Sequence, residues 1–599
     1  MSERPRVQAQ VVAAVTEQAP DRVRRKLDRS PQAAQDWKWS HKSGDWTVEA
    51  GNETVQLSTA DGSIQSAEDV SCSCLLSPRC FHVLACLTIL ELAADALAEP
   101  VSAETPEVPS GELAPDPAFA ASWSPELQQT ALLMWDQSAA LIAAGGRSAG
   151  TLLQAQLLRA VHECRSRGLH RLAAAGLRVV QQVRDLRSNA AHFHSAEYLA
   201  DLTELLETAW RLSHAESSIS PAWLGTARRQ YNPVSNLKLQ GAFCEPILTT
   251  SGYAGVATYL IDGEGRLLSV SNVRPGEARR VVEAYQTGVD VGKLTLSHQE
   301  LSRRGLLVQN PAVSADGRLG SGQHCRAMAV DRGGWQQGAL DDRFAAPLSQ
   351  QIQQVFDSST DDLLARPAGW DLLFVEGIVL GTNGRSLLLE AGSTLLELRV
   401  AQDHEQLAYR ENLELLTRSP GLALRAIARL IPAERGCATA LAVAPLASSP
   451  ADAPQWQLPE SWQGHVNLGL DRLRRSRLSR AETAPVHCPV ELDCSNDDGL
   501  SALERRLRAM ALGGRHSVPT GRVRDLAREV RQLKNQLQPT AAALLARFAE
   551  VAVTTQTTTL GYRFPPDPAP LASLWLACAC YHRSAAWAFH KQHWLSLAA

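Results

Sequence analysis

The chain has 599 residues, a formal net charge of -4 and a 45% apolar composition. This length predicts roughly three or four domains of about 150 residues, and the apolar fraction is typical of globular rather than disordered chains. The near-neutral charge excludes a general attraction to nucleic acid or to anionic membrane, so any such contact would need a local basic patch.

The N-terminal sequence MSERPRVQAQVV contains no apolar segment of signal-peptide length, and no run of about 18 apolar residues occurs in the chain. Its 12 cysteines are scattered outside one short stretch, unlike those of a secreted disulfide scaffold. We therefore expect a cytoplasmic protein with reduced thiols and no membrane span. A composition rich in Ala, Leu and Arg and poor in Lys is associated with high-GC bacterial genomes.

Residues 1–97 form the first predicted domain. One or two short helices are expected within 1–35, where PDRVRRKLDRS is basic. Alternating polar and apolar residues then predict strands near 46–49 and 55–57, and FHVLACLTILELAADALA has apolar residues at helical spacing. The core of this domain, 37–97, is therefore expected to be strand, strand, loop and helix.

The loop before this helix, in VSCSCLLSPRCFH, carries Cys72, Cys74, Cys80 and His82. Residues two apart in an extended segment point the same way, so Cys72 and Cys74 can face one ion. The helix N-terminus favours a thiolate at Cys80. Three thiolates and one imidazole fill the tetrahedral shell of Zn²⁺, which predicts one structural zinc ion and no open position for water.

This C-x-C, spacer, C-x-H order between paired strands and a helix resembles the SWIM-type zinc finger. The resemblance covers roughly residues 35–97, and its spacer LLSPR lies near the short end of the family's range. The segments CEPILTTSGYAGVATYLID and LSHQELSRRGLLVQNPAVSADGRLG are also similar to bacterial SWIM proteins of about this length. Some of those resemble components encoded beside MoxR-type AAA+ ATPases, which implies a partner of that kind.

Two alternatives remain open at this stretch. The four residues could lie in a metal-free loop. Cys86, one helical turn beyond His82, could replace a ligand or pack as a small core residue.

The rest of the chain is expected to contain four further regions. Residues 98–118 are an acidic, Pro-rich linker, and 119–217 contain four amphipathic helices that predict a bundle. Residues 231–470 are expected to be α+β with antiparallel sheet, including a hairpin turning at Asp262-Gly263 and a meander turning at Asn383-Gly384. Residues 471–599 combine a basic segment with a helical C-terminal region. The predicted fold class is thus α+β multidomain.

Other chemical motifs are weak. HCPVELDC at 487–494 could hold a second metal, but it lacks a clean second ligand pair. CACYH at 578–582 lies in a predicted helix, where residues two apart diverge, so core packing is favoured. His324 and Cys325 are sequence neighbours, which rarely form a catalytic dyad. No nucleotide-binding or catalytic-triad motif occurs in the sequence.

Two basic stretches are candidates for contact with phosphates. Their arginines are Arg22, Arg24, Arg25, Arg472, Arg474, Arg475 and Arg477. The alternative is a solvated helix face, because Asp21, Asp28, Asp471 and Glu482 lie nearby in sequence. No aromatic residues are interleaved with the arginines, which disfavours stacking on single strands.

These patterns predict a zinc-binding recognition protein rather than an enzyme. The first hypothesis is an adaptor that binds a protein partner in a larger assembly, favoured by the acidic linker and the near-neutral charge. The second is a DNA- or RNA-binding factor, favoured by the arginine clusters. The third, an enzyme with a site in residues 231–470, has no motif to support it, and no small-molecule substrate is evident.

Overall fold

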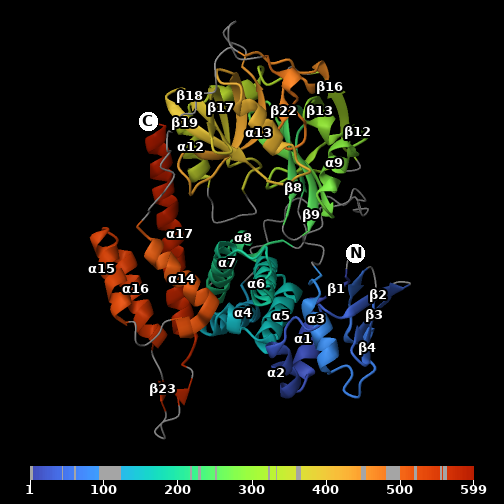
Figure 1. Ribbon diagram of the computed structural model, residues 1–599, viewed down its shortest axis with the longest axis vertical. Helices are drawn as coiled ribbons and strands as arrows, with labels where there is room; N and C mark the ends of the chain where they lie inside the picture. Colours follow the sequence, from blue (N-terminus) through green and yellow to red (C-terminus); the bar gives the residue numbers. More distant parts are fainter. Residues whose placement is uncertain are drawn as a thin grey trace. The chain divides into compact units, whose positions relative to one another are not determined.

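The computed structural model confirms an α+β multidomain fold (Figure 1). The residues that it describes are 4–42, 45–59, 62–93, 123–215, 219–226, 231–249, 252–320, 324–331, 334–358, 366–446, 454–479, 499–517, 523–553, 556–557, 563–564 and 566–598. The predicted linker at 98–118 and the candidate metal segment at 487–494 lie outside these residues. The described residues form two compact units, one drawn from 1–98, 112–228 and 497–585 and the other from 229–496 and 586–599.

The first unit begins with a small antiparallel sheet and three short helices. Its elements are β1 (Arg6–Val7), α1 (Ala9–Gln18), α2 (Asp21–Arg29), β2 (Lys38–Lys42), β3 (Asp45–Ala50), β4 (Glu53–Ser58), β5 (Ser63–Ile64), β6 (Val70–Cys72) and α3 (Phe81–Ile89). The main sheet has the order β2-β3-β4-β6. Strands β3 and β4 and helix α3 confirm the predicted elements, and the flanking strands β2 and β6 complete the sheet.

Helices make up the remainder of the first unit. They are α4 (Pro125–Ala144), α5 (Thr151–Ser166), α6 (His170–Ser188), α7 (Ser195–Ser213), α8 (Pro221–Leu224), α14 (Ser501–Gly513), α15 (Val523–Asn535), α16 (Pro539–Val553) and the first part of α17 (Ala569–Leu597), with a short ladder of β23 (Gln556–Thr557) and β24 (Arg563–Phe564). Helices α4 to α7 are the four predicted between 119 and 217. The Ser124 side chain caps α4 by accepting from the Leu127 N–H, and Asn189 ends α6 in the left-handed region.

One apolar core joins these parts of the first unit. It contains Val48 and Leu57 from the small sheet, Leu84 from α3, Leu158 from α5 and Trp575 from α17. Helix α1 packs directly on α5. The segments predicted as an N-terminal domain, a helical domain and much of a C-terminal region therefore share a single core, because each has an apolar face that it cannot bury alone.

The second unit is built on antiparallel sheet. Its elements are β7 (Tyr231–Pro233), β8 (Leu237–Leu248), β9 (Tyr253–Ile261), β10 (Leu267–Pro275), α9 (Arg279–Gln286), β11 (Gly288–Val291), β12 (Leu294–Ser297), α10 (His298–Leu301), β13 (Gly305–Gln309), β14 (Ala312–Ser314), β15 (Leu319–Gly320), β16 (Arg326–Val330), α11 (Ala339–Ala345), α12 (Leu348–Asp357), β17 (Leu372–Asn383), β18 (Ser386–Ala391), β19 (Thr394–Val400), α13 (Tyr409–Thr417), β20 (Ala423–Leu430), β21 (Cys437–Pro445) and β22 (Val466–Asn467). The β9–β10 hairpin and the β17–β18–β19 meander confirm both predicted turns.

Strands β17 to β21 close into a barrel. The order β19-β18-β17-β20-β21 is antiparallel throughout, and a parallel pairing of β19 with β21 joins its two ends. A three-strand meander, a helix and a two-strand hairpin in this order form the topology of the OB-fold barrel. The five-stranded sheet β10-β9-β8-β13-β16 remains open, and the unit also contains the smaller sheets β11-β12 and β15-β14-β7.

A buried polar cluster lies in the core of the second unit. The Asp471 carboxylate accepts from Arg303 Nη2 at 2.7 Å, from the Tyr285 hydroxyl at 3.0 Å and from the Asn467 N–H at 2.9 Å. The Asn467 side chain in turn accepts from the Cys244 N–H of β8 at 2.9 Å. The Asp471 carboxylate is therefore satisfied by three hydrogen bonds, as a buried charge requires, whereas Arg303 Nε is buried without a hydrogen-bond partner among the described residues.

Candidate metal centre

The first two cysteines of the metal centre are placed by strand β6. Cys72 ends this strand opposite Val55 of β4, and the Ser73 N–H continues the ladder by donating to the Thr54 carbonyl at 3.0 Å. The Ser73 hydroxyl accepts from the Thr54 N–H at 2.9 Å. The strand ends at Cys72 and the chain bends at Ser73 and Cys74, so this bend, rather than a continued strand, brings the two sulfurs within 4.8 Å of each other.

The other two ligand residues are placed by helix α3. Cys80 is its N-cap residue, and the Cys80 sulfur accepts from the Val83 N–H at 3.4 Å. His82 lies in the first turn. Between the two ligand pairs, the Ser77 hydroxyl accepts from the Cys72 N–H at 2.9 Å, which draws the loop back toward the strand.

The four ligand atoms converge on one point. Those of Cys72, Cys74, Cys80 and His82 all lie within 4.8 Å of one another, and Cys72 Sγ is 3.7 Å from His82 Nδ1. A tetrahedral zinc ion with Zn–S bonds of about 2.3 Å has ligand atoms about 3.8 Å apart. The residues predicted from the sequence therefore come together as a group that could hold a metal ion, with His82 facing it through Nδ1.

Electrostatics favour a cation among these side chains. Burial raises the pKa of the Cys80 thiol to about 12 and also raises the pKa of Cys72. Cys72 and Cys74 raise the pKa of Cys80 further, whereas at Cys72 the effect of Cys74 is partly opposed by a hydrogen bond with Cys80. Burial lowers the pKa of His82, which keeps its imidazole neutral and its lone pair available. A divalent cation would offset the cost of ionising the thiols, and its affinity would fall with pH because protons compete for the sulfurs.

Aromatic side chains hold the histidine ring. Trp37 lies 6.0 Å from the ring of His82 and 6.2 Å from that of Phe81, centroid to centroid. Lys26 of α2 places its ammonium 4.1 Å from the centroid of Phe81. These contacts restrict the rotation of His82 and connect the basic helix α2 to the metal centre.

Cys86 is separate from the four ligands. Its side chain is fully buried in the apolar core, and burial raises the pKa of its thiol. A buried thiol with this pKa behaves as a small apolar group. The structure thus places Cys86 where a core residue was expected.

The remaining cysteine candidates do not form a second centre among the described residues. Cys578 and His582 lie on α17, and Cys578 is buried in the core of the first unit. Cys325 is also buried, and burial raises its pKa, which disfavours the thiolate that a nucleophile requires.

The two arginine stretches lie in different units and differ in structure. Arg22 and Arg25 are exposed on α2, whereas Arg24 donates to the carbonyls of Thr16, Glu17 and Ala19 and so caps α1. The second stretch has no α-helical face. It contains a short 3₁₀ turn at Arg475–Arg477, and Asp471 turns inward to the buried cluster. In this stretch Arg472 lies 3.9 Å from Glu411, and Arg474, Arg475 and Arg477 have no carboxylate partner among the described residues.

Sequence reasoning did not single out the tip of the ligand loop. Leu75 is fully exposed and Leu76 is 45% exposed, although both are apolar. Two adjacent leucines in a loop between metal ligands are the signal that could have identified this surface.

Comparisons with protein-family models, with curated proteins and with solved structures return no match for this chain. None of the helices in the described part of the chain has both the length and the apolar character needed to cross a membrane.

Proposed function

We propose that this chain is a zinc-binding recognition protein whose residues 37–97 form a SWIM-type finger for a protein partner. The ligand set carries the proposal, since three sulfurs and one imidazole nitrogen lie within 4.8 Å of one another. Four protein ligands complete the zinc shell and leave no position for a reactive water. The ion would therefore order the loop rather than take part in a reaction.

The exposed leucines of the ligand loop favour a protein as the partner. Leu75 and Leu76 lie between the second and third ligands, so a bound ion would restrain both. Apolar side chains on a restrained loop lose less conformational entropy on binding than those on a free loop. From the resemblance to bacterial SWIM proteins, we further propose that this partner belongs to an AAA+ ATPase system.

Metal analysis and partner capture test this function together. Elemental analysis of the reduced, purified chain should find one zinc ion per molecule. Cross-linking from the native host should recover a partner with the parent chain and lose it with Leu75→Ser/Leu76→Ser. Leu132→Ser is the matched control, because Leu132 of α4 is 44% exposed and lies outside the finger. Equal recovery with the loop variant would reject the loop as the contact surface.

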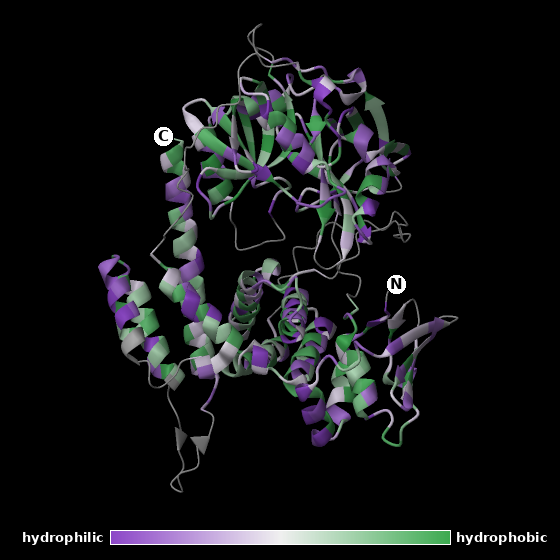
Figure 2. Cartoon of the chain, in the orientation of Figure 1, coloured by the Kyte–Doolittle hydropathy of each residue, from purple (hydrophilic) through white to green (hydrophobic). Residues whose placement is uncertain are grey.

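A specific feature of α2 supports a second function, nucleic-acid binding. Arg22, Arg25, Lys26 and Arg29 recur at helical spacing and line a surface hollow of about 510 Å³. Helix α2 is mostly hydrophilic in Figure 2. Four cations on one helical face are the arrangement that phosphate binding requires.

The acids near α2 do not neutralise this face. Asp21 pairs with Arg24. Asp28 accepts from the Thr151 N–H at the start of α5 at 2.9 Å and lies 3.4 Å from Arg187. The solvated-face alternative depended on both carboxylates, but Asp21 pairs with Arg24 of the same helix and Asp28 has its partners on α5 and α6.

Salt dependence tests the second function. If α2 contacts phosphates, the affinity for duplex DNA or for RNA falls with salt, and Arg22→Gln/Arg25→Gln lowers the slope of that dependence by about two. Arg167→Gln, at an exposed ion pair with Glu126, serves as the control and should leave the slope unchanged. A slope unaffected by the double substitution would reject α2 as the contact face.

A further inference from the structure

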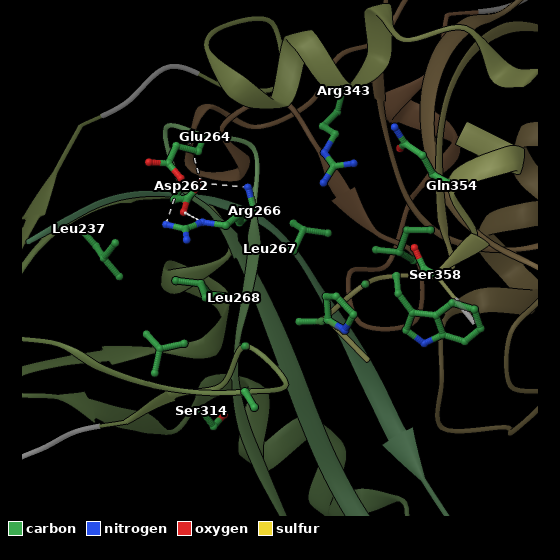
Figure 3. Close-up of a pocket in the computed structure, with 18 of the residues that line it drawn as sticks. Leu237, Asp262, Glu264, Arg266, Leu267, Leu268, Ser314, Arg343, Gln354 and Ser358 are labelled. Carbon is green, nitrogen blue, oxygen red and sulfur yellow. Dashed lines mark hydrogen bonds and ion pairs between the residues drawn. The ribbon is translucent and has the colours of Figure 1, made fainter. Parts of the chain in front are cut away.

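The second unit contains a hollow that no sequence motif indicates. Its volume is about 850 Å³, within the range of about 300–1,000 Å³ that is usual for small-molecule sites (Figure 3). The β9–β10 hairpin lines one side, and helices α11 and α12 line the other. Much of the wall is apolar, with Leu237, Leu267, Val355 and Leu372 among its side chains.

One arginine in this wall, Arg343, forms no ion pair with the described residues. Arg343 of α11 donates from Nε at 3.1 Å and from Nη2 at 2.7 Å to the carbonyl of Gly265. No carboxylate among the described residues lies within ion-pair distance of Arg343, and no described group accepts a hydrogen bond from its Nη1. Figure 3 shows its guanidinium directed into the hollow, with Gln354 nearby.

The opposite side carries two carboxylates and one cation, and the cation contacts both carboxylates. Asp262 accepts from Arg266 Nε at 2.8 Å and from the N–H groups of Glu264 and Arg266 at 2.9 Å each. Arg266 Nη2 also lies 3.3 Å from the Glu264 carboxylate. Of the two lining arginines, Arg266 is paired with these carboxylates, and Arg343 has no carboxylate within ion-pair distance among the described residues. Burial lowers the pKa of Arg343, and the more distant charge of Asp262 opposes that shift.

The two sides are held in place without a ligand. Arg343 joins α11 to the hairpin turn at Gly265. On α12, the Gln351 amide donates to the Phe374 carbonyl at 2.9 Å and accepts from the Phe374 N–H at 2.7 Å, as a neighbouring strand would. A site ordered before binding avoids the entropy cost of ordering it during binding.

We propose that this hollow binds a small organic anion, with an apolar body against the leucines and one carboxylate, phosphate or sulfonate group paired with Arg343. A charge-assisted hydrogen bond in a partly desolvated wall is stronger than a neutral one. This site lies in the second unit and does not depend on the metal centre or on the function proposed for it.

A matched pair of fluorescent probes tests the proposal on the full chain. 8-Anilinonaphthalene-1-sulfonate and neutral N-phenyl-1-naphthylamine share a ring skeleton and differ by the sulfonate. We expect one saturable site that binds the sulfonate at least about tenfold more tightly than the neutral probe. Arg343→Gln should remove that preference and leave the neutral probe's affinity unchanged, whereas Arg343→Lys should keep part of the preference.

Two further variants separate binding in the hollow from other effects. Gln354→Trp, on the exposed face of α12, should fill the hollow and weaken both probes, whereas Arg326→Gln, an exposed arginine outside the hollow, should change neither. If Arg343→Gln does not fold, two other results test whether the hollow binds an anion. These are the loss of probe binding in Gln354→Trp and the preference of the parent chain for the sulfonate probe over the neutral one. The proposal is overturned if the parent binds both probes equally, if Gln354→Trp leaves both unchanged, or if Arg343→Gln weakens both alike.

Discussion

The two units stabilise clustered polar side chains in different ways. The first unit does so at the metal centre, and the second does so at the buried cluster around Asp471. In the second unit, Asp471 receives three hydrogen bonds from Arg303, Tyr285 and Asn467, so the chain itself supplies every partner. In the first unit, the half-buried thiols of Cys72 and Cys74, the buried thiol of Cys80 and the imidazole of His82 face one another, and thiolates in this cluster would be stabilised by a bound cation. Order in the small sheet should therefore depend on a bound metal, whereas order around Asp471 should not.

Substitution of a metal-ligating residue should have the largest effect on zinc content and protease resistance. It should change the first unit and leave the second unit unchanged. Cys74→Ala or His82→Ala should abolish stoichiometric zinc, because structural zinc contributes about 10–16 kcal/mol in small fingers. Limited proteolysis should then cut within the finger, upstream of residue 98, and leave the second unit intact. Cys86→Ala is the control and should retain the metal, since Cys86 lies in the core. Equal protease resistance in parent and ligand variants would falsify the structural role of the metal.

Substitution in the buried Arg303–Asp471 ion pair should have the next largest effect. It should lower the unfolding free energy of the second unit only. Asp471→Asn keeps the shape of the side chain but leaves the Arg303 charge buried without a counter-ion, which should cost about 3–5 kcal/mol of unfolding free energy. Calorimetry should show a lower transition temperature with unchanged zinc content. Asp357→Asn, at an exposed pair with Lys591, should have a much smaller effect, because solvent screens an exposed ion pair. A loss no larger than that of this control would mean that the buried pair is not important for stability.

Acid should affect the two regions by different routes. Burial lowers the pKa of His298 to about 4, below the value of about 6.5 expected when the chain is unfolded. The unfolded state then binds the proton first, so stability is full above about pH 6.5 and falls as the pH drops toward 4, by roughly 3 kcal/mol.

His298→Gln should reduce this slope, as measured by urea unfolding of the second unit across that range of pH. Zinc release should be followed separately with a chelating dye, since protonation of the thiols also removes the metal. If the slope is the same in His298→Gln as in the parent, His298 does not account for the acid sensitivity.

Removal of a hydrogen bond within the ligand loop should have the smallest effect, a change in metal affinity. Ser77→Ala removes the hydroxyl that accepts from the Cys72 N–H, and loss of such a supporting contact commonly weakens metal affinity by about tenfold or more. Competition with a chelator measures this change. Ser71→Ala, at an exposed position of β6, is the control, and equal affinities in the two variants would show that the Ser77 contact is dispensable.

Local patterns were sufficient for many elements of the fold. The alternation around Trp46 and Val48 predicts β3, and turns at Asp262-Gly263 and Asn383-Gly384 predict the hairpins that are observed. The four metal-ligating residues could be named because they lie within eleven residues of one another, between a strand and a helix. Spacing along one strand and one helical turn is local geometry, which the order of residues specifies directly.

Long-range features could not be predicted in the same way. Closure of the barrel needs β19 beside β21, and Asp471 meets an arginine 168 residues earlier in the chain. Arg24 and Arg25 are neighbours in one basic run, yet the first caps α1 and the second is exposed. The hollow around Arg343 joins a hairpin, two helices and a loop that share no motif.

The order of residues by itself therefore determined the secondary structure of many segments and the ligand set of the metal centre, because both follow from contacts between near neighbours. The tertiary structure alone decided which charges are neutralised, which apolar faces share a core, and where a hollow lies whose Arg343 has no ion-pair partner in the described part of the chain. Those properties depend on distances between segments that are remote in sequence, and such distances are fixed only when apolar surfaces pack together.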